Sequence, residues 1–147
     1  MRVLALVLLF CAATSAMTVR EARDKVVDGT MRYLNVPYLW GSEHPQTGLD
    51  CSAFVRRVYG DAGLALPRVS REQFATAVAV PPGAVLPGDI IFFSMRAPGS
   101  SRVDHVGIYV GKGWFVHAGV SHGVHIEPIA KAYFQDRLIR VLKYPGF

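Results

Sequence analysis

The sequence has little cysteine, no apolar run long enough to cross a membrane, and only one pair of adjacent basic residues. Its two cysteines are Cys11 and Cys51. Since Cys11 falls in an N-terminal segment that we expect to be removed, the mature chain would keep one cysteine and form no internal disulfide. The basic residues are scattered and are not interleaved with aromatics, which argues against a nucleic-acid partner. The net charge of +5 suits a soluble basic surface or attraction to a polyanion.

Residues 1–16 are predicted to form a secretory signal peptide. Arg2 precedes an apolar run that ends at Ala13, and small residues lead to a cleavage site after Ala16, with cleavage after Ala13 as the alternative. We therefore expect a secreted or periplasmic protein with no stable membrane insertion after cleavage, because the run is too short for a bilayer span. Lipoprotein anchoring through Cys11 is not expected, since a lipobox has a small residue where this chain has Phe10.

Residues 17–147 are predicted to form a single globular domain, with 51% hydrophobic and 18% charged residues across the chain. Hydrophobic periodicity predicts helices over 18–34 and 50–62 and a short helix from Ser70. Strands are predicted over 90–93, 103–110, 114–118, 123–128 and 138–143, with a helical turn near 130–134. Helices followed by four or five antiparallel strands predict an α+β domain with helices packed on one side of a sheet. We expect this domain to be a monomer.

Three predicted helix starts carry residues that suit an N-cap. Thr18 with Glu21, and Ser70 with Gln73, have the spacing of a capping box. Asp50 is the N-cap candidate at the start of the helix 50–62, where its carboxylate can accept the free amide protons of the first turn.

Cys51 follows Asp50 and occupies the first position of that helix. The helix macrodipole favours a thiolate over a thiol at this end. The simpler interpretation is a buried cysteine that packs as a small hydrophobe, and for a cysteine without chemical neighbours that interpretation is the stronger one. A base close to the thiol would reverse the preference.

Two histidines in a predicted hairpin are candidates for that base. His105 and His117 lie on the strands 103–110 and 114–118, which residues 111–113 connect. A connecting loop with an odd number of residues places both on one face of the sheet, whereas a two-residue loop without a bulge separates them. The apolar opposite face is expected to consist of Val106, Ile108, Val110, Trp114, Val116 and Ala118.

A cysteine nucleophile needs a base, and the base needs a third group that fixes its tautomer. If the N-terminus of helix 50–62 lies over the sheet face that bears His105, this imidazole can accept the proton of Cys51. His117 can then orient the ring of His105.

Tyr38, Ser52 and Asp50 complete the candidate site as oxyanion-binding and substrate-binding residues. A tyrosine hydroxyl that points at the thiol can donate to an oxyanion, as can the backbone amides of Cys51 and Ser52. Tyr38 lies in a loop that leads into the helix, where an aromatic residue more often packs at the rim of a site.

A metal site is the main chemical rival to this interpretation. His117, His122 and His125 are close in sequence, but no acidic or cysteine residue stands at zinc-like spacing from them. We therefore expect neither a metal nor another cofactor, although spacing alone does not decide metal binding by His122 and His125.

Six motifs follow one another between residues 36 and 118. They are VPYLWG (36–41), LDCSAFV (49–55), LPRVSREQ (66–73), LPGDIIFF (86–93), DHVGIYV (104–110) and FVHA (115–118). In this order they resemble the NlpC-type family of bacterial cell-wall cysteine peptidases, with weaker similarity toward the C-terminus. Six ordered motifs are a far more specific signal than any one of them.

The resemblance implies a papain-like α+β fold and hydrolysis of amide bonds in peptidoglycan stem peptides, typically between γ-D-glutamate and a diamino acid. By position, Cys51 matches the family nucleophile, His105 its base and His117 its third polar residue. Tyr38 matches the tyrosine that lines the oxyanion site.

The chain departs from the family pattern at Ala53 and Ser42, which replace two usual glycines, and its loop from Trp40 to Cys51 is one residue longer. These departures concern substrate fit rather than chemistry. Two alternatives stay open: a non-catalytic cell-wall-binding module, and a peptidoglycan amidase or acyltransferase on the same fold.

Overall fold

The computed structural model describes residues 16–147, so the predicted signal peptide, with Cys11, lies outside the described residues except for Ala16. The helices are α1 (Val19–Met31), α2 (Cys51–Asp61), α3 (Ser70–Thr76) and α4 (Ala132–Gln135). The strands are β1 (Glu43–His44), β2 (Gly48–Leu49), β3 (Val78–Ala79), β4 (Ile90–Phe93), β5 (His105–Gly111), β6 (Trp114–Gly119), β7 (Gly123–Pro128) and β8 (Leu138–Lys143). Within residues 16–147, no helix has the length and hydropathy to cross a bilayer.

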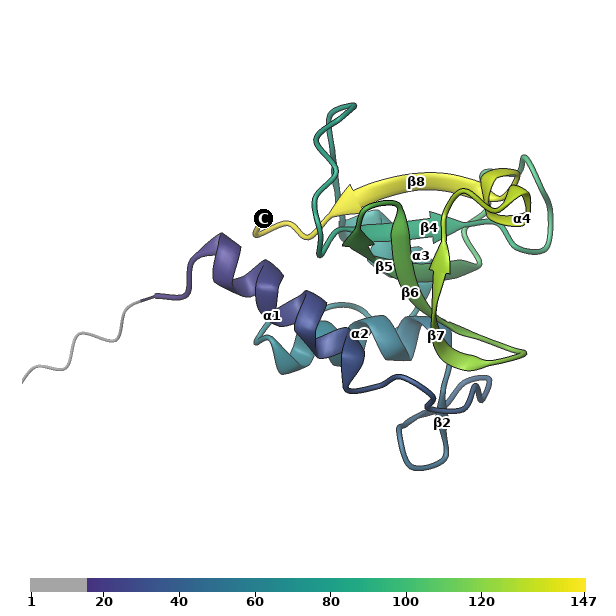
Figure 1. The fold of residues 1–147 in the computed structure, drawn as a ribbon, viewed down its shortest axis with the longest axis horizontal. Helices are drawn as coiled ribbons and strands as arrows, with labels where there is room; N and C mark the ends of the chain where they lie inside the picture. The colour runs from purple at the N-terminus through teal and green to yellow at the C-terminus, as the bar shows by residue number, and fades with distance from the viewer. Residues whose placement is uncertain (1–15) are drawn as a thin grey trace, which may run out of the picture.

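One antiparallel sheet organises the fold, with the strand order β3-β8-β4-β5-β6-β7. Helices α1 and α2 lie together on one side of it (Figure 1). The predicted α+β class is confirmed. The sheet has six strands rather than the expected four or five, because Val78 and Ala79 pair with the end of β8 as a short edge strand.

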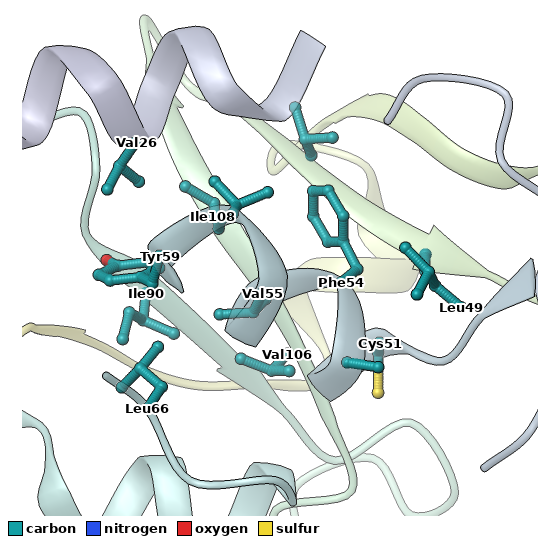
Figure 2. Close-up of a cluster of buried hydrophobic side chains, with 14 of the residues drawn as sticks. Val26, Leu49, Cys51, Phe54, Val55, Tyr59, Leu66, Ile90, Val106 and Ile108 are labelled. Atoms are coloured by element: carbon teal, nitrogen blue, oxygen red, sulfur yellow. The ribbon is translucent and has the colours of Figure 1, made fainter. Parts of the chain in front are cut away.

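Helix α2 packs its apolar face against the centre of this sheet. Phe54, Val55 and Tyr59 are fully buried and pack with Val106 and Ile108 of β5 (Figure 2). Each such side chain contributes roughly 1.5–3 kcal/mol to stability through removal of its apolar surface from water. The packing therefore fixes α2, and the residue at its N-terminus, relative to β5.

The opposite face of the sheet has its own, smaller core. Phe93 of β4 and Phe115 of β6 pack against Phe134 of α4, with ring centroids 5.7 and 4.9 Å away. His105 lies near Phe93, and His117 stacks on Phe115 at 4.8 Å. Both histidines therefore belong to the face turned away from α2.

A bulge in the β5–β6 hairpin places His105 and His117 on the same face of the sheet. Tyr109 pairs with Phe115, but Gly111 pairs with Trp114, so one extra residue is inserted on β5. The turn itself has two residues, and without the bulge it would put His105 and His117 on opposite faces. The expectation that Trp114 belongs to the core is wrong: next to the turn it remains 46% exposed.

Side-chain caps form at two of the three helix starts for which the sequence predicts them. Thr18 and Glu21 form the predicted capping box of α1. The predicted box at α3 is wrong, because Val69 is the N-cap residue and no side chain caps it. Gln73 instead is fully buried, and its amide donates to the carbonyl of Ser52 (3.0 Å), which ties α3 to the start of α2.

A buried ion pair joins α1 to the turn before β4. The Arg23 guanidinium donates to Asp89 Oδ1 at 2.8 Å, and the two side chains are 12% and 1% exposed. The other carboxylate oxygen accepts from the Leu86 amide at 2.8 Å. A buried pair of this kind is costly to break from one side, because the remaining charge loses its partner.

We expect Asp89→Ala to lower the free energy of unfolding by about 3 kcal/mol in urea titrations, because Arg23 stays buried without a counter-charge. Asp24→Ala is the matched control. It removes a carboxylate from an exposed pair with Arg20 (3.9 Å) and should change stability by less than about 1 kcal/mol. Equal effects of the two substitutions would contradict the assigned role of the pair.

Candidate active site

Asp50 anchors the N-terminus of α2, as predicted. Its Oδ1 accepts from the Ala53 amide at 2.8 Å and from the Ser52 hydroxyl at 3.1 Å. Its Oδ2 accepts from the Gly41 amide at 3.1 Å. The carboxylate therefore fixes both the first turn of the helix and the loop that precedes it, with Cys51 between them.

Arg68 neutralises this carboxylate. The guanidinium donates to Asp50 Oδ2 at 2.6 Å and to Oδ1 at 3.0 Å, a two-point contact typical of strong carboxylate pairs. It also donates to the Ser52 hydroxyl at 3.0 Å and lies 3.1 Å from Glu43. Burial alone would raise the pKa of Asp50, but the hydrogen bonds from Arg68 and from the Ala53 amide outweigh it and lower this pKa.

His105 and His117 are in direct contact. His105 Nε2 and His117 Nδ1 lie 2.8 Å apart, and the rings are nearly perpendicular at 88°. Burial lowers the pKa of His105 to about 4. Burial and the neighbouring imidazole of His105 lower the pKa of His117 to about 2. Both rings are therefore neutral near pH 7. Because His105 contacts His117 through Nε2, its Nδ1 atom is available to another partner.

Two glycines make room for His117. A Cβ at Gly107 would lie 2.8 Å from the carbonyl oxygen of Val116 and 3.1 Å from the Cβ of His117. A Cβ at Gly119 would lie 3.2 Å from the ring of His117 and 2.9 Å from that of His125. The side chain of His117 can therefore lie where it does only because neither position carries a side chain.

Cys51 lies at the margin of the main core, and its side chain is almost completely buried (Figure 2). Burial and the nearby charge of Asp50 raise the pKa of the thiol to about 12. Backbone amides of Val106, Ser52 and Cys51 oppose this shift without cancelling it. Burial therefore opposes the effect of the helix dipole and favours the thiol over the thiolate.

Helix α2, which carries the thiol, lies on the side of the sheet opposite to the one expected. Helix α2 does not cover the face that bears His105, contrary to expectation; it covers the opposite face. The amide of Val106 nevertheless faces the sulfur of Cys51, which places the sulfur at the start of β5, next to the residue that follows His105 in the chain. Among residues 16–147 no hydrogen bond joins this thiol to the His105 ring.

Tyr38 lies on the loop in front of Cys51, which a bridge between Tyr38 and Leu49 holds against β2. Burial and the nearby Cys51 and Asp50 raise the pKa of Tyr38 to about 12. The phenol therefore keeps its proton and can donate it in a hydrogen bond.

Two adjoining cavities meet at these residues. One, of about 630 Å³, is lined by His105, His117 and Tyr38. The other, of about 460 Å³, is lined by Cys51 and by the Asp50–Arg68 pair. The two share Trp40, Arg96 and Asp104 as lining residues. A bound chain can therefore place its two ends in different cavities, with the thiol and imidazole between them.

His125 packs against His117, and His122 packs against His125. The His125 ring lies 4.5 Å from that of His117 and 5.2 Å from that of His122. Its Nδ1 lies 2.8 Å from the Gly123 carbonyl, and its Nε2 lies 3.3 Å from Glu127. In the described part of the chain, no three metal-ligating side chains are placed to hold an ion.

Sequence reasoning missed the roles of Arg68 and Gln73 in holding the site together. Both residues occur in the motif 66–73, so the sequence identified this segment but did not show which residues the segment contacts. Their partners, Asp50 and Ser52, lie 18 and 21 residues earlier in the chain. Only the folded arrangement brings these side chains together.

The comparisons with known proteins agree with this architecture. The model of the NlpC/P60 family matches residues 35–143. The chain is 33% identical over 120 residues to the gamma-DL-glutamyl hydrolase of Bacillus subtilis, covering 81% of this chain and 29% of that protein. It is also 33% identical over 116 residues to the bifunctional muramidase/DL-endopeptidase CwlT of the same species, covering 79% of this chain and 35% of that protein.

A solved structure extends the comparison to the fold. The peptidoglycan hydrolase RipB of Mycobacterium tuberculosis superposes with a TM-score of 0.65 at 29% identity, covering 85% of this chain and 67% of that one. The chain thus spans about a third of the length of the two curated relatives and most of the structural neighbour. With its papain-like fold and a family match over most of its length, the chain belongs to the NlpC/P60 family.

Proposed function

We propose that this protein is a secreted or periplasmic cysteine endopeptidase that cleaves peptidoglycan stem peptides between γ-D-glutamate and a diamino acid. Two observations support the proposal: the buried contact between His105 and His117, and the N-terminal cysteine of α2, whose sulfur faces the amide of Val106. The names of the two Bacillus relatives, a DL-endopeptidase and a gamma-DL-glutamyl hydrolase, support a glutamyl acyl group.

The first half of the reaction forms a thioester. As the Cys51 sulfur attacks the substrate carbonyl carbon, the thiol proton moves to Nδ1 of His105. His105 Nε2–H then donates to His117 Nδ1, which stabilises the imidazolium. The oxyanion accepts hydrogen bonds from the Tyr38 hydroxyl and the backbone amides of Cys51 and Ser52. Collapse breaks the C–N bond, and His105 gives its proton to the leaving amine.

The second half of the reaction consumes water. His105, neutral again, takes a proton from a water molecule that attacks the thioester carbonyl. The C–S bond breaks, the carboxylic acid leaves, and the proton returns to the sulfur. His117 must accept at Nδ1 throughout, so its own proton is on Nε2. This atom is buried without a partner among the described residues.

We expect Cys51→Ala to abolish release of peptides from purified sacculi, with a loss of about 10⁴-fold or more, because Cys51 is the only cysteine in the part of the chain that the structure describes. Near-UV circular dichroism and thermal unfolding establish that the variant is folded. Mass spectrometry of the wild-type products identifies the cleaved bond and separates an endopeptidase from an amidase or acyltransferase. Undiminished cleavage by the variant would rule out the mechanism, and binding of sacculi without any release would favour the wall-binding alternative.

We expect kcat/KM to stay level through neutral pH and to fall as the pH drops through about 4. Protonated His105 cannot accept the thiol proton, and burial lowers its pKa from 6.5 to about 4. An activity loss centred near pH 6.5 would contradict a buried, neutral base. Circular dichroism at each pH is needed as a control, because the unfolded chain binds protons at higher pH than the folded one. Stability is therefore also expected to fall between about pH 6.5 and 4.

A further inference from the structure

His117 has one hydrogen-bond partner among the described residues. Its Nδ1 lies 2.8 Å from His105 Nε2, while its own Nε2 is buried without a partner. In histidines with a fixed role, a hydrogen bond at the second ring nitrogen usually sets the tautomer and the orientation. Because His117 lacks this bond, packing must hold its ring with Nδ1 toward His105.

Two rings pack directly against the imidazole of His117. Phe115 stacks on it from the same strand, with the ring centroids 4.8 Å apart. His125 is the residue directly opposite His117 in the pairing of β6 with β7, and its ring centroid lies 4.5 Å away. A Cβ at Gly119 would lie 2.9 Å from the ring of His125 and 3.2 Å from that of His117. The two imidazoles therefore meet above a position that carries no side chain.

His125 is itself held at both ring nitrogens. Nδ1 lies 2.8 Å from the Gly123 carbonyl oxygen, and Nε2 lies 3.3 Å from Glu127 Oε1. Carbonyl and carboxylate oxygens only accept hydrogen bonds, so both contacts are favourable together only when both nitrogens carry a proton. Lys131 pairs with the other oxygen of Glu127 and holds the carboxylate in place. The geometry therefore favours a cationic ring at His125, in contact with His117.

The titratable groups around His125 come from several elements. His117 faces it from β6, and Glu127 follows it on β7. Exposed His122, in the turn between these strands, has its ring 5.2 Å away, and Lys131 approaches from the segment before α4. These groups contain one carboxylate, which His125 shares with Lys131. With His117 neutral, the net charge beside it is therefore positive.

A positive charge at this place keeps His117 an acceptor. Burial is the first cause of the low pKa of His117, and the charges of His105 and His125 lower this pKa further. The proton that His105 takes from Cys51 then stays on His105, because its transfer to His117 would bring two cations into contact. Burial is also the first cause of the low pKa of His105; Asp104 opposes that shift, and the charge of His125 adds to it.

We propose that His125 is a positioning residue of the catalytic centre, whose ring holds His117 with Nδ1 toward His105 and whose positive charge keeps His117 unprotonated. The inference rests on the proposed function, because it gives His125 a part in the proton transfer described above. Within the described residues the ring of His125 packs against His117 and His122, so it acts on His105 through His117. Since His125 also borders the larger cavity, the test must separate positioning from contact with substrate.

Nitrogen NMR of the imidazole groups in the isotope-labelled wild-type protein tests the arrangement without substrate. At pH 7 we expect His117 to carry its proton on Nε2 and none on Nδ1, and His125 to be protonated at both nitrogens. A neutral His125, or a proton on Nδ1 of His117, would overturn the proposal. This measurement needs no variant, so it holds even if a substitution at His125 prevents folding.

Two substitutions then separate the ring from its charge in cleavage of a synthetic L-Ala-γ-D-Glu-diaminopimelate peptide. His125→Ala removes both, and we expect kcat to fall roughly ten- to hundredfold with little change in KM, because His117 is no longer held. His125→Phe keeps a ring against His117 and should recover most of this loss at neutral pH. Both variants lack the charge that lowers the pKa of His105, so their activity loss in acid should move upward by about half a pH unit.

His44→Phe is the matched control. His44 is exposed on β1 and lines neither cavity of the site, so this variant should keep the wild-type kcat and pH profile. Unchanged kinetics in folded His125→Ala, a rise in KM alone, or a lower kcat with the wild-type pH profile in both His125 variants would each overturn the positioning role while leaving the endopeptidase intact. Failure of the folded wild type to cleave the peptide would instead overturn the proposed function, and the positioning role with it.

Discussion

The carboxylate of Asp50 is the interaction on which the rest of the site depends. It caps α2, holds the loop before the helix through Gly41, and pairs with Arg68. Cys51 is the next residue, so the same contacts that begin the helix also fix the position of the sulfur. The cost is electrostatic, because a negative charge beside the thiol opposes a thiolate. Arg68 reduces that cost by neutralising the carboxylate.

The second constraint is the burial of the reacting groups. Cys51, His105 and His117 are all nearly buried, and burial moves each pKa toward the neutral form. At rest the thiol and both imidazoles are therefore neutral. Charge then appears only during attack, where backbone amides and the Tyr38 hydroxyl can stabilise it. The centre itself is enclosed, so a substrate chain must lie in the two adjoining cavities.

Local chemistry explains what could be predicted from the sequence. Asp50 is an N-cap because its side chain contacts only the next turn, and helix periodicity placed Cys51 correctly. The pairing of His105 with His117 depended on a bulge, which the sequence left undecided between two registers. The protonation state of Cys51 could not be predicted, because burial arises from distant segments. The role of Gln73 was missed for the same reason: its partners lie outside its own helix.

The central claim is that Cys51 becomes covalently bound to the acyl half of the substrate. The most direct test is acid quenching during turnover of a stem peptide, followed by proteolysis and mass spectrometry of the protein. Our account predicts that the peptide containing Cys51 gains the mass of the alanyl-glutamyl group, and that hydroxylamine removes it, as expected for a thioester. Turnover without any acyl group on Cys51, or with one on another residue, would contradict it.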